Sequence, residues 1–493
     1  MSEWKFYGRQ PELSTLVEIL GRRRWFFVKI SGRRRIGKTT LIQEALRRSQ
    51  AGADMRPVLY VQIPDSGDAG VLSAVLDAMD TFNVPRDAFP LPQNLNQLAK
   101  TLESLLRAGY VVVLDEFQYF NRTQFTEFCS FLQAAVDRLN AQPMEIRGGL
   151  VVLGSIQTEM DALLEDRSAP LYNRITDELE IGHLDISSVF SILSDHAEAT
   201  PERLLFLWSL FEGVPKFYRD CWEQGVLNAD RATLLRKMFF DSSSPLRSEA
   251  DNWFLRELRG RYDMVLKFVA TKPGSNHGEL VEAITAISGG TKQQLGGYLK
   301  VLCEKYQLLE AKLPIFAKST ERKRRYYISD NFLYSWLGAL AKSVAARDFQ
   351  PVESLVASAN TRLENIEGAM LEKLVAEIYE ELSRKGRGEF PLTHRIQGFW
   401  DRQGTEIDFV ALDENTKRIR FGSCKRSPQK LVADLNNFRG HVARFLEAFP
   451  VYKSWTQELY GIAPRLDAET RGRLSDNQIV AQDLMDLLNQ LNP

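Results

Sequence analysis

The first 185 residues alternate between short apolar runs and longer segments whose apolar residues recur at helical spacing. Three of the runs, Trp25–Ile30, Tyr110–Leu114 and Gly149–Leu153, have almost no polar interruption. Strands that are covered on both faces of a parallel sheet show this continuous pattern. Because these strand patterns alternate with helical ones, we predict a parallel α/β sheet over this part of the chain.

The middle of the chain is predicted to be helical and then to form a winged helix. The pattern is helical over residues 184–240, with one interruption at Gly213–Pro215, and the turn-rich segment Asp241–Ala250 marks a boundary. Within residues 259–336, three helical patterns precede two strand patterns that flank the charged loop STERK. Three helices followed by a basic hairpin are typical of a winged helix.

The last part of the chain predicts a further α/β unit. A long amphipathic helix is expected over Asn365–Lys385, and strand patterns follow at Thr405–Leu412 and Arg418–Lys425. The predicted fold class is therefore an α/β multidomain protein.

The clearest functional motif lies between the first apolar run and the helical pattern after it. Ser31–Leu41 reads SGRRRIGKTTL and contains the complete pattern G-x-x-x-x-G-K-[ST]. In such a loop, backbone N–H groups meet phosphate oxygens, the lysine reaches the β- and γ-phosphates, and the hydroxyl binds Mg²⁺. Strand, loop and helix occur in the required order, which favours a nucleoside triphosphate site over an ordinary glycine-rich turn. The predicted binding residues are Gly32, Arg33, Arg34, Arg35, Ile36, Gly37, Lys38, Thr39 and Thr40.

Polar residues follow the other two apolar runs and complete the predicted site. Asp115 fits the carboxylate that holds Mg²⁺, and Glu116 fits the base that orients the attacking water. The alternative is that the two acids simply begin a loop. Ser155 ends the third run, where it would sense the γ-phosphate or begin a turn.

Composition and charge argue against several classes of protein but add no further motif. The 493 residues are 44% hydrophobic and 26% charged, with a net charge of −1, so no global field draws the chain to nucleic acid or membrane. No apolar run approaches the ~20 residues of a membrane span, and the N-terminus lacks a signal-peptide pattern. The scattered cysteines predict neither a zinc site nor a disulfide framework; they are Cys129, Cys221, Cys303 and Cys424. We expect a cytoplasmic protein with no membrane partner.

Several short motifs occur in one order that resembles a known family. They are FYGRQPEL at Phe6–Leu13, the glycine-rich loop, LDEFQYF at Leu114–Phe120, GS at Gly154–Ser155, PLYNR at Pro170–Arg174 and GVP at Gly213–Pro215. Together they resemble the archaeal-type ATPases, a branch of the AAA+ superfamily close to the signal-transduction ATPases with numerous domains. YYISDNFLYSW at Tyr326–Trp336 is similar to the segment that closes the winged helix in longer members. Those members also carry a C-terminal domain similar to PD-(D/E)XK nucleases.

The resemblance implies an ATPase that uses ATP and Mg²⁺ and has four domains. These are a P-loop AAA+-type domain over residues 1–185, a helical lid over 186–250, a winged helix over 251–345 and a nuclease-like α/β domain over 346–493.

The resemblance also implies roles for residues outside the loop. Gly8 and Arg9 would lie at the nucleotide base and ribose. Pro215 would lie where the lid packs near the nucleotide, which would couple nucleotide state to the winged helix. Arg174 would approach the γ-phosphate or another domain, and the alternative is a surface or structural arginine.

The last two strand patterns contain a candidate metal site. Side chains two apart share a face of a strand, so Ser423 and Lys425 point the same way and Asp408 on the facing strand can meet them. A nuclease of this type needs two carboxylates to hold Mg²⁺ and a lysine to polarise water. Asp408 and Lys425 are in place, and Glu372 matches the additional acid of the family, but Ser423 occupies the position of the second carboxylate.

Three interpretations of this C-terminal region remain open. In the first, Glu406 or Glu372 completes the metal shell. In the second, which we favour, the domain keeps a nuclease fold without cleavage activity. The third is an ordinary α/β domain with a chance hairpin.

The predicted winged helix offers a candidate nucleic-acid surface. Its recognition helix carries Lys292, and its wing carries Lys318, Arg322, Lys323, Arg324 and Arg325. Clustered cations bind DNA with a strong dependence on salt. Winged helices in ATPases of this kind also serve as protein–protein or interdomain modules, so protein contact is the alternative.

Two functions are therefore carried forward. The first is an ATP-driven enzyme or switch that acts on DNA, in genome defence or mobile-element biology. The second is an ATP-gated regulator or adaptor whose inactive nuclease fold holds a DNA or protein partner. Partners besides ATP would be duplex DNA, another protein or a second copy of the chain.

Overall fold

The computed structural model describes residues 3–50, 55–249, 261–288 and 292–491. The chain folds into two compact units. The P-loop unit contains Gly8–His183 and Val214–Lys216, and the C-terminal unit contains Met1–Tyr7, Leu184–Gly213 and Phe217–Pro493. Apart from Val214–Lys216, the predicted lid, winged helix and nuclease-like segments belong to the C-terminal unit.

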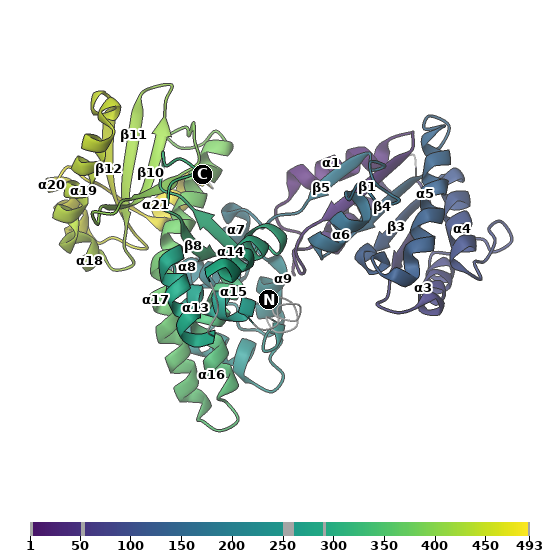
Figure 1. Cartoon of the computed structure of the whole chain (residues 1–493), viewed down its shortest axis with the longest axis horizontal. Coiled ribbons are helices and arrows are strands. Elements are labelled where there is room, and N and C mark those ends of the chain that lie inside the picture. Colours follow the sequence, from purple (N-terminus) through teal and green to yellow (C-terminus); the bar gives the residue numbers. More distant parts are fainter. Residues whose placement is uncertain (1–2, 51–54, 250–260, 289–291, 492–493) are drawn as a thin grey trace. The chain divides into compact units, whose positions relative to one another are not determined.

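The P-loop unit is built on a five-stranded parallel sheet with the order β2-β3-β4-β1-β5 (Figure 1). Every neighbouring pair is parallel. The strands are β1 (Phe26–Ser31), β2 (Val58–Gln62), β3 (Val111–Asp115), β4 (Gly149–Leu153) and β5 (Asp177–Glu180). Since the strands are parallel, the segments that follow β1, β3 and β4 all leave the sheet at the same edge. This sheet confirms the predicted fold of the first domain.

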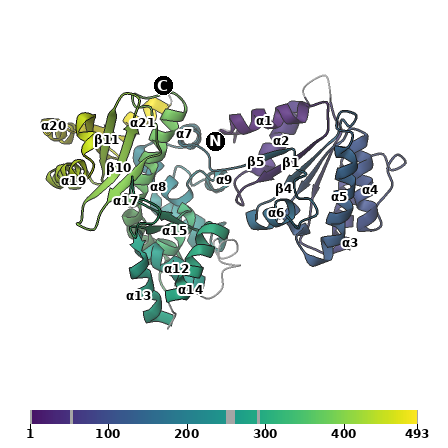
Figure 2. The ribbon, with the colours of Figure 1, turned by 45° about the horizontal axis from the view of Figure 1, so that its top comes forward.

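Helices cover both faces of this sheet (Figures 1 and 2). Trp25 and Phe27 pack in a core with apolar side chains of α3, α4, α5 and α6. Alternate residues of a strand point to opposite faces, so the equally buried Phe26 and Val28 face the other side. The helices are α1 (Gln10–Gly21), α2 (Lys38–Ser49), α3 (Asp68–Thr81), α4 (Leu95–Arg107), η1 (Phe117–Phe120), η2 (Thr123–Phe125), α5 (Thr126–Asn140) and α6 (Gln157–Leu164).

The C-terminal unit begins with the predicted helical segment. Its elements are α7 (Ile186–His196), α8 (Pro201–Phe211), α9 (Pro215–Glu223), α10 (Arg231–Leu235) and the π-helical turn η3 (Arg236–Phe240). The interruption expected at Gly213–Pro215 separates α8 from α9.

Three helices and a small antiparallel sheet follow, where a winged helix is predicted. The helices are α12 (Arg261–Thr271), α13 (His277–Ser288) and α14 (Lys292–Lys300), which continues into η4 (Val301–Lys305). The strands β6 (Ser275–Asn276), β7 (Leu309–Lys312) and β8 (Arg325–Ile328) pair in the order β6-β8-β7. We call β7, β8 and the residues between them the hairpin.

One long helix, α17, connects the parts of the C-terminal unit. It follows α15 (Asn331–Ser335), η5 (Trp336–Leu340) and α16 (Ala341–Ala345), and it spans Val352–Arg384. The helix begins well before the predicted Asn365, because Leu355, Val356 and Ala359 extend its buried face. It contacts α8 and α10 along one part and β10 and β11 along another.

The C-terminal sheet combines antiparallel and parallel strands. Its order is β13-β12-β11-β10-β9, with antiparallel pairing from β9 to β11 and parallel pairing from β11 to β13. The strands are β9 (Gln397–Trp400), β10 (Glu406–Asp413), β11 (Arg418–Cys424), β12 (Thr456–Ala463) and β13 (Val480–Asp483). The helices are α18 (Pro428–Ala433), α19 (Leu435–Ala448), η6 (Pro450–Ser454), α20 (Ala468–Asp476) and α21 (Leu484–Leu491). A separate C-terminal α/β sheet was predicted and is present.

Among the helices in the described part of the chain, none combines the length and the apolar character that a membrane span requires.

Candidate functional site

The glycine-rich loop joins β1 to α2 and needs glycine at two positions. A Cβ atom on Gly32 would lie 2.5 Å from the carbonyl oxygen of Ile181, and Gly32 has a φ of +146°. Gly37 has a φ of +94° and caps the N-terminus of α2. Glycine adopts these conformations without the steric cost that a side chain would add. A Cβ on Gly37 would lie 3.4 Å from Cγ of Pro215, which places Pro215 against the loop, as the resemblance implies.

Lys38 is buried beneath the loop. Its Nζ donates hydrogen bonds to the carbonyl oxygens of Gly32, at 2.8 Å, and Arg33, at 3.0 Å. Burial lowers the pKa of Lys38 to about 8, although the negative charges of Glu116 and Asp115 oppose this shift. The ammonium group is therefore held in the concave side of the loop, where its charge is poorly solvated and an anionic ligand would stabilise it.

Thr39 and Asp115 form the oxygen pair predicted for Mg²⁺. Thr39 Oγ1 donates to Asp115 Oδ2 at 2.8 Å, and the backbone N–H of Glu116 donates to Asp115 Oδ1 at 2.8 Å. The Tyr60 hydroxyl, on the neighbouring strand β2, also bonds to Asp115. A hydroxyl and a carboxylate are the hard oxygen ligands that Mg²⁺ prefers, so these residues suit the ion. Tyr60 was not predicted, since a tyrosine in an apolar strand carries no motif.

Glu116 and Ser155 come together from β3 and β4. Ser155 Oγ donates to Glu116 Oε2 at 3.0 Å. Gln118 links the two residues, because its amide nitrogen bonds to the Glu116 carboxylate and lies 3.3 Å from Ser155 Oγ. Glu116 has a φ of +58°, a left-handed conformation that is uncommon outside glycine, asparagine and aspartate and that turns the chain sharply out of β3. Gln118 lies in the LDEFQYF motif but had no predicted role.

The Arg9 side chain bonds to the backbone of the loop. Its guanidinium donates to the carbonyl of Ile36 at 2.9 Å and to that of Gly182 at 2.8 Å. Both Gly8 and Arg9 have positive φ angles, +63° and +57°. The observed role of Arg9 is to hold the loop in place, and contact with a base or ribose stays a prediction.

The other loop residues differ in exposure. Ile36 is buried, whereas Arg34 and Thr40 are exposed. Arg33 lies 3.3 Å from the His183 ring nitrogen, and Arg35 has a φ of +66°. Their contact with phosphate stays a prediction.

The structure places Arg174 in an ion pair within the P-loop unit. Arg174 forms two hydrogen bonds with Asp137 at the end of α5, at 2.7 and 3.0 Å. The nearby Thr176 donates its backbone N–H to Phe27, at the start of β1, whereas the loop follows the end of that strand. The six residues of β1 span about 20 Å. These contacts are those expected of a structural arginine, and an approach of Arg174 to the γ-phosphate or another domain stays a prediction.

The C-terminal carboxylate site brings Asp408 and Lys425 together as predicted. Lys425 Nζ donates to Asp408 Oδ2 at 2.9 Å, and the same oxygen accepts the backbone N–H of Cys424 at 2.7 Å. Burial raises the pKa of Asp408, although Lys425 opposes the shift. The ion pair means that Lys425 already neutralises this carboxylate.

The other two acids near Asp408 are not arranged as a metal shell. Burial, and the charge of Asp408, raise the pKa of Glu372 well above its usual range. Glu406 is turned toward the hairpin, where it binds Arg325 at 2.6 Å. Among the described residues, these three acids do not approach closely enough to share one ion. Ser423 is buried in β11 opposite Gly461 of β12.

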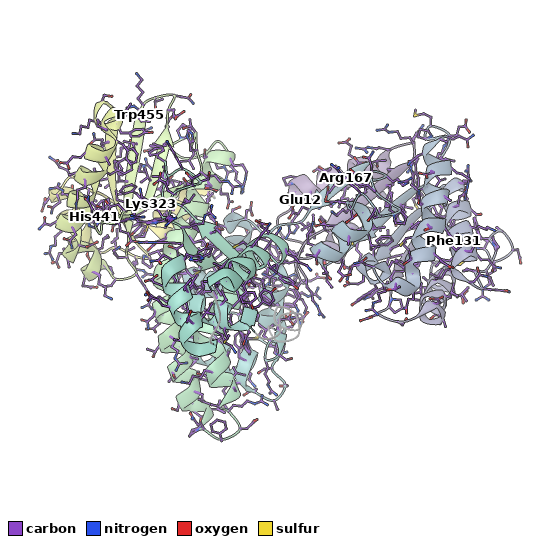
Figure 3. All side chains as sticks on the ribbon, in the orientation of Figure 1. Glu12, Phe131, Arg167, Lys323, His441 and Trp455 are labelled. Carbon is purple, nitrogen blue, oxygen red and sulfur yellow. The ribbon has the colours of Figure 1, made fainter. Side chains whose placement is uncertain are left out.

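The hairpin is docked on the C-terminal sheet. Ile315 donates its N–H to the carbonyl of Gly398 at 2.9 Å. Trp400 Nε1 donates at 2.9 Å to the carbonyl of Lys323, a residue that Figure 3 labels. Arg325 lies over the Trp400 ring, 4.7 Å from its centroid. Ile315 also belongs to the apolar core of this sheet.

Docking divides the predicted DNA-binding residues into two groups. Arg325 and Lys323 are paired with Glu406 and Glu321, and their contact with DNA stays a prediction. The outer group of Lys318, Arg322 and Arg324 is exposed. The side chain of Lys292 lies outside the described residues.

Two family descriptions match parts of the chain. Residues 25–164 match the AAA domain, and residues 336–433 match a family described as archaeal and bacterial proteins of unknown function. The first match contains the loop, Asp115, Glu116 and Ser155. It confirms the predicted P-loop ATPase domain of AAA type, and the second match is compatible with the predicted nuclease-like domain.

Similar proteins are found in archaea. The uncharacterized protein MJECL04 of Methanocaldococcus jannaschii is 24% identical over 450 residues, which are 87% of this chain and 91% of that protein. The Walker-type ATPase PABY2304 of Pyrococcus abyssi is 17% identical, with 67% of this chain and 96% of that chain covered and a TM-score of 0.49. The ORC2 protein of Aeropyrum pernix, in ADPNP–ADP complexes, is 15% identical, with 74% and 97% covered and a TM-score of 0.48.

Proposed function

We propose that this chain binds and hydrolyses ATP at the glycine-rich loop, and that the nucleotide state controls the C-terminal unit. The geometry at the edge where three parallel strands end supports ATP binding and hydrolysis. There, Thr39 bonds to Asp115, and Glu116 bonds to Ser155. Lys38 and the N-terminus of α2 would receive the phosphates. Thr39 and Asp115 would hold Mg²⁺, which would neutralise charge on the phosphates.

Glu116 would act as the base that orients the attacking water. Its carboxylate accepts hydrogen bonds from Ser155 and Gln118, which fix its direction without adding a positive charge. Ser155 would sense the γ-phosphate through the same contact. This arrangement assigns separate tasks to neighbouring groups: phosphate binding to Lys38, metal binding to Thr39 and Asp115, and water activation to Glu116.

Two substitutions test this assignment. Lys38→Ala should abolish ATP binding, because it removes the cation that faces the terminal phosphates. Glu116→Gln should preserve binding and slow hydrolysis by ~10²-fold or more, the scale of losing a general base. Calorimetry measures binding and phosphate release measures turnover. Unchanged turnover in Glu116→Gln would contradict the role of this residue.

For the C-terminal unit, we propose a regulator or adaptor whose nuclease-like domain binds a partner without cleaving it. The observation that favours this over cleavage is the pairing of Asp408 with Lys425 and of Glu406 with Arg325. A paired carboxylate must give up its cation before it can bind Mg²⁺. The outer hairpin cations fit duplex DNA as the partner, and another protein or a second copy of the chain is the alternative.

A further inference from the structure

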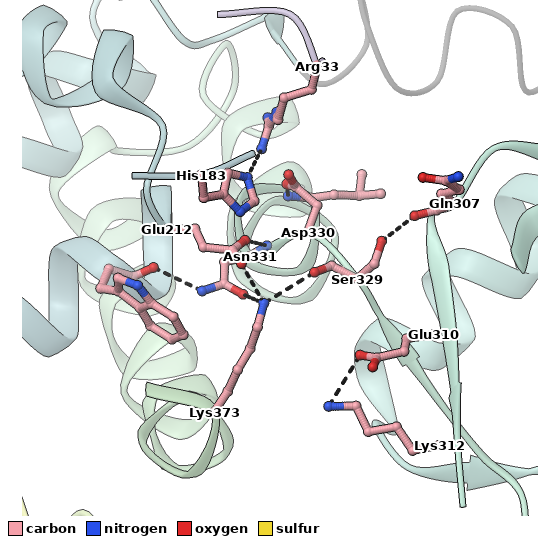
Figure 4. Close-up of polar contacts among 12 residues, drawn as sticks. Arg33, His183, Glu212, Gln307, Glu310, Lys312, Ser329, Asp330, Asn331 and Lys373 are labelled. Atoms are coloured by element: carbon pink, nitrogen blue, oxygen red, sulfur yellow. Dashed lines mark hydrogen bonds and ion pairs between the residues drawn. The ribbon is translucent and has the colours of Figure 1, made fainter. Parts of the chain in front are cut away.

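A buried charge cluster in the C-terminal unit surrounds the turn that leads to Pro215. Lys373 of α17 donates to Glu212 Oε1 at 2.7 Å and to Asn331 Oδ1 at 2.9 Å, and lies 3.3 Å from the carbonyl of Ser329 (Figure 4). Glu212 also accepts the backbone N–H of Asn331 at 3.2 Å. The lid, the helix after the hairpin and α17 therefore meet at one carboxylate.

Glu212 has an unusual backbone conformation. It ends α8 with a φ of +49° and a ψ of −135°, a strained region that a residue with a side chain rarely occupies. Its own backbone is fixed on both sides, because its N–H bonds to Trp208 and its carbonyl accepts the Tyr218 hydroxyl at 2.6 Å. Such a conformation persists only where the surroundings enforce it.

The last turn of α8 is held in the same way. Two carbonyl groups in this turn accept side chains from α15, with Asn331 bonded to Trp208 at 3.0 Å and Ser335 bonded to Ser209 at 2.9 Å. The carbonyls at helix ends lack some of their partners inside the helix, so side chains can bond to them. The end of α8 is thus fixed by residues more than 100 positions further along the chain.

Glu212 is three residues before Pro215, and Pro215 packs against Gly37 of the loop. We propose that Lys373 and Glu212 are positioning residues of the nucleotide site: their ion pair fixes the turn that holds Pro215 against the loop. This inference rests on the proposed ATP binding and extends it. Neither residue would touch ATP; each would act through Pro215.

The position of Lys373 adds a second consequence. It directly follows Glu372, the acid of the C-terminal carboxylate site, in the same turn of α17. A change in the conformation of the turn at Glu212 would therefore affect the turn of α17 that carries Glu372. The ion pair gives the chain a physical route by which ATP binding and the C-terminal site affect each other, and such coupling is reciprocal.

The experiment compares two lysines of α17 that both pair with the lid segment. Lys373→Met removes the ammonium group that bonds to the buried Glu212 carboxylate, and losing one partner of a buried ion pair is strongly unfavourable, so the turn should shift. Lys385→Met is the matched control, because Lys385 bonds to Asp185 at 3.0 Å and to Ser187 at 2.6 Å, at the start of α7. The full-length chain is used throughout.

We expect Lys373→Met to weaken ATP binding by about tenfold, within the usual range of coupling between sites. The effect should appear in Kd and KM for ATP, with kcat nearly unchanged, since the substitution leaves Glu116 and its hydrogen bond from Ser155 in place. Lys385→Met should leave Kd within about twofold. The double variant Glu212→Gln/Lys373→Met removes both charges and should recover most of the lost affinity, because the two residues act as one unit.

Equal Kd values for Lys373→Met and Lys385→Met would overturn this inference while leaving ATP binding intact. A wild-type chain that does not bind ATP would overturn the proposed function and this inference together. If Lys373→Met fails to fold, hydrogen exchange on the wild-type chain decides: ATP should protect the amides of α17 around Lys373 and not those near Lys385. Equal protection at both places would contradict the inference.

Discussion

At the P-loop, Asp115 and Glu116 accept hydrogen bonds from neutral hydroxyl and amide groups. In the C-terminal sheet, Asp408 is instead bonded to the Lys425 ammonium, and Glu406 is bonded to a guanidinium. Neutral donors orient a carboxylate and leave its charge available, whereas a bound cation must be displaced before a metal can enter. Two sites with similar residues therefore differ in what they can bind.

The largest expected effect comes from making the same substitution at both sites. Asp115→Asn should lower kcat for ATP hydrolysis on the order of 100-fold or more, because the metal loses its anionic oxygen ligand and its charge stabilisation. Asp408→Asn should leave hydrolysis within about twofold. Steady-state phosphate release measures both variants. A similar loss in the two variants would contradict the assignment of the catalytic metal to Asp115 of the P-loop site.

The second prediction concerns Ser423, which occupies the position expected for the second carboxylate of a metal nuclease. Ser423→Glu adds a carboxylate near Asp408 and should create Mg²⁺-dependent DNA cleavage on the order of tenfold or more above the wild-type chain. Adding Lys425→Ala to this variant should remove the new cleavage, since a lysine polarises the attacking water. A plasmid-nicking assay with and without chelator measures the effect.

Two outcomes would change the interpretation of this site. Cleavage by the wild-type chain that Asp408→Ala abolishes would show that Glu406 or Glu372 completes the shell. If neither protein cleaves and Asp408→Ala leaves partner binding unchanged, the strands do not form a site.

The third prediction uses the lowered pKa of Lys38. Its folded value of about 8 lies below the usual 10.5, so the folded chain loses the Lys38 charge as pH rises through 8, and the cost of burying that charge declines between pH 8 and 10.5. Bound phosphate requires the charged form. ATP binding should therefore take up a proton and weaken about tenfold between pH 7 and pH 9.

Calorimetry at both pH values, in buffers with different ionisation enthalpies, measures the affinity and the proton uptake. Lys38→Arg provides the control, because a guanidinium stays charged over this range and should remove the proton uptake. Proton uptake that persists in Lys38→Arg would assign the titration to another group.

The smallest expected effect concerns the hairpin. Neutralising the outer group (Lys318, Arg322 and Arg324) should weaken duplex DNA binding severalfold and reduce the salt slope by roughly 0.9 for each phosphate that the chain no longer neutralises. Arg325→Ala should leave the salt slope unchanged and lower the melting temperature, because Arg325 holds the hairpin to Glu406 and Trp400. Gel shifts at several salt concentrations and thermal unfolding separate the two roles. Absence of DNA binding by the wild-type chain at low salt would favour a protein partner.

Much of the P-loop site was predictable because its residues lie in short contiguous motifs. The loop itself specifies Lys38 and Thr39, and an apolar run that ends in two acids specifies Asp115 and Glu116. Tyr60 and the pairing of Arg174 were not predictable in this way. Tyr60 reaches Asp115 only because β2 lies beside β3, and Arg174 finds Asp137 only because α5 ends near the start of β1.

By itself, the sequence determined the order of helices and strands, the loop and the two acids after β3, because local pattern and chain direction are enough to specify them. Only the tertiary structure decided which cation neutralises which carboxylate. Lys373 meets Glu212, and Arg325 meets Glu406, across 161 and 81 positions of sequence. Ion pairs between distant segments depend on how helices and sheets pack, and no local pattern encodes that packing.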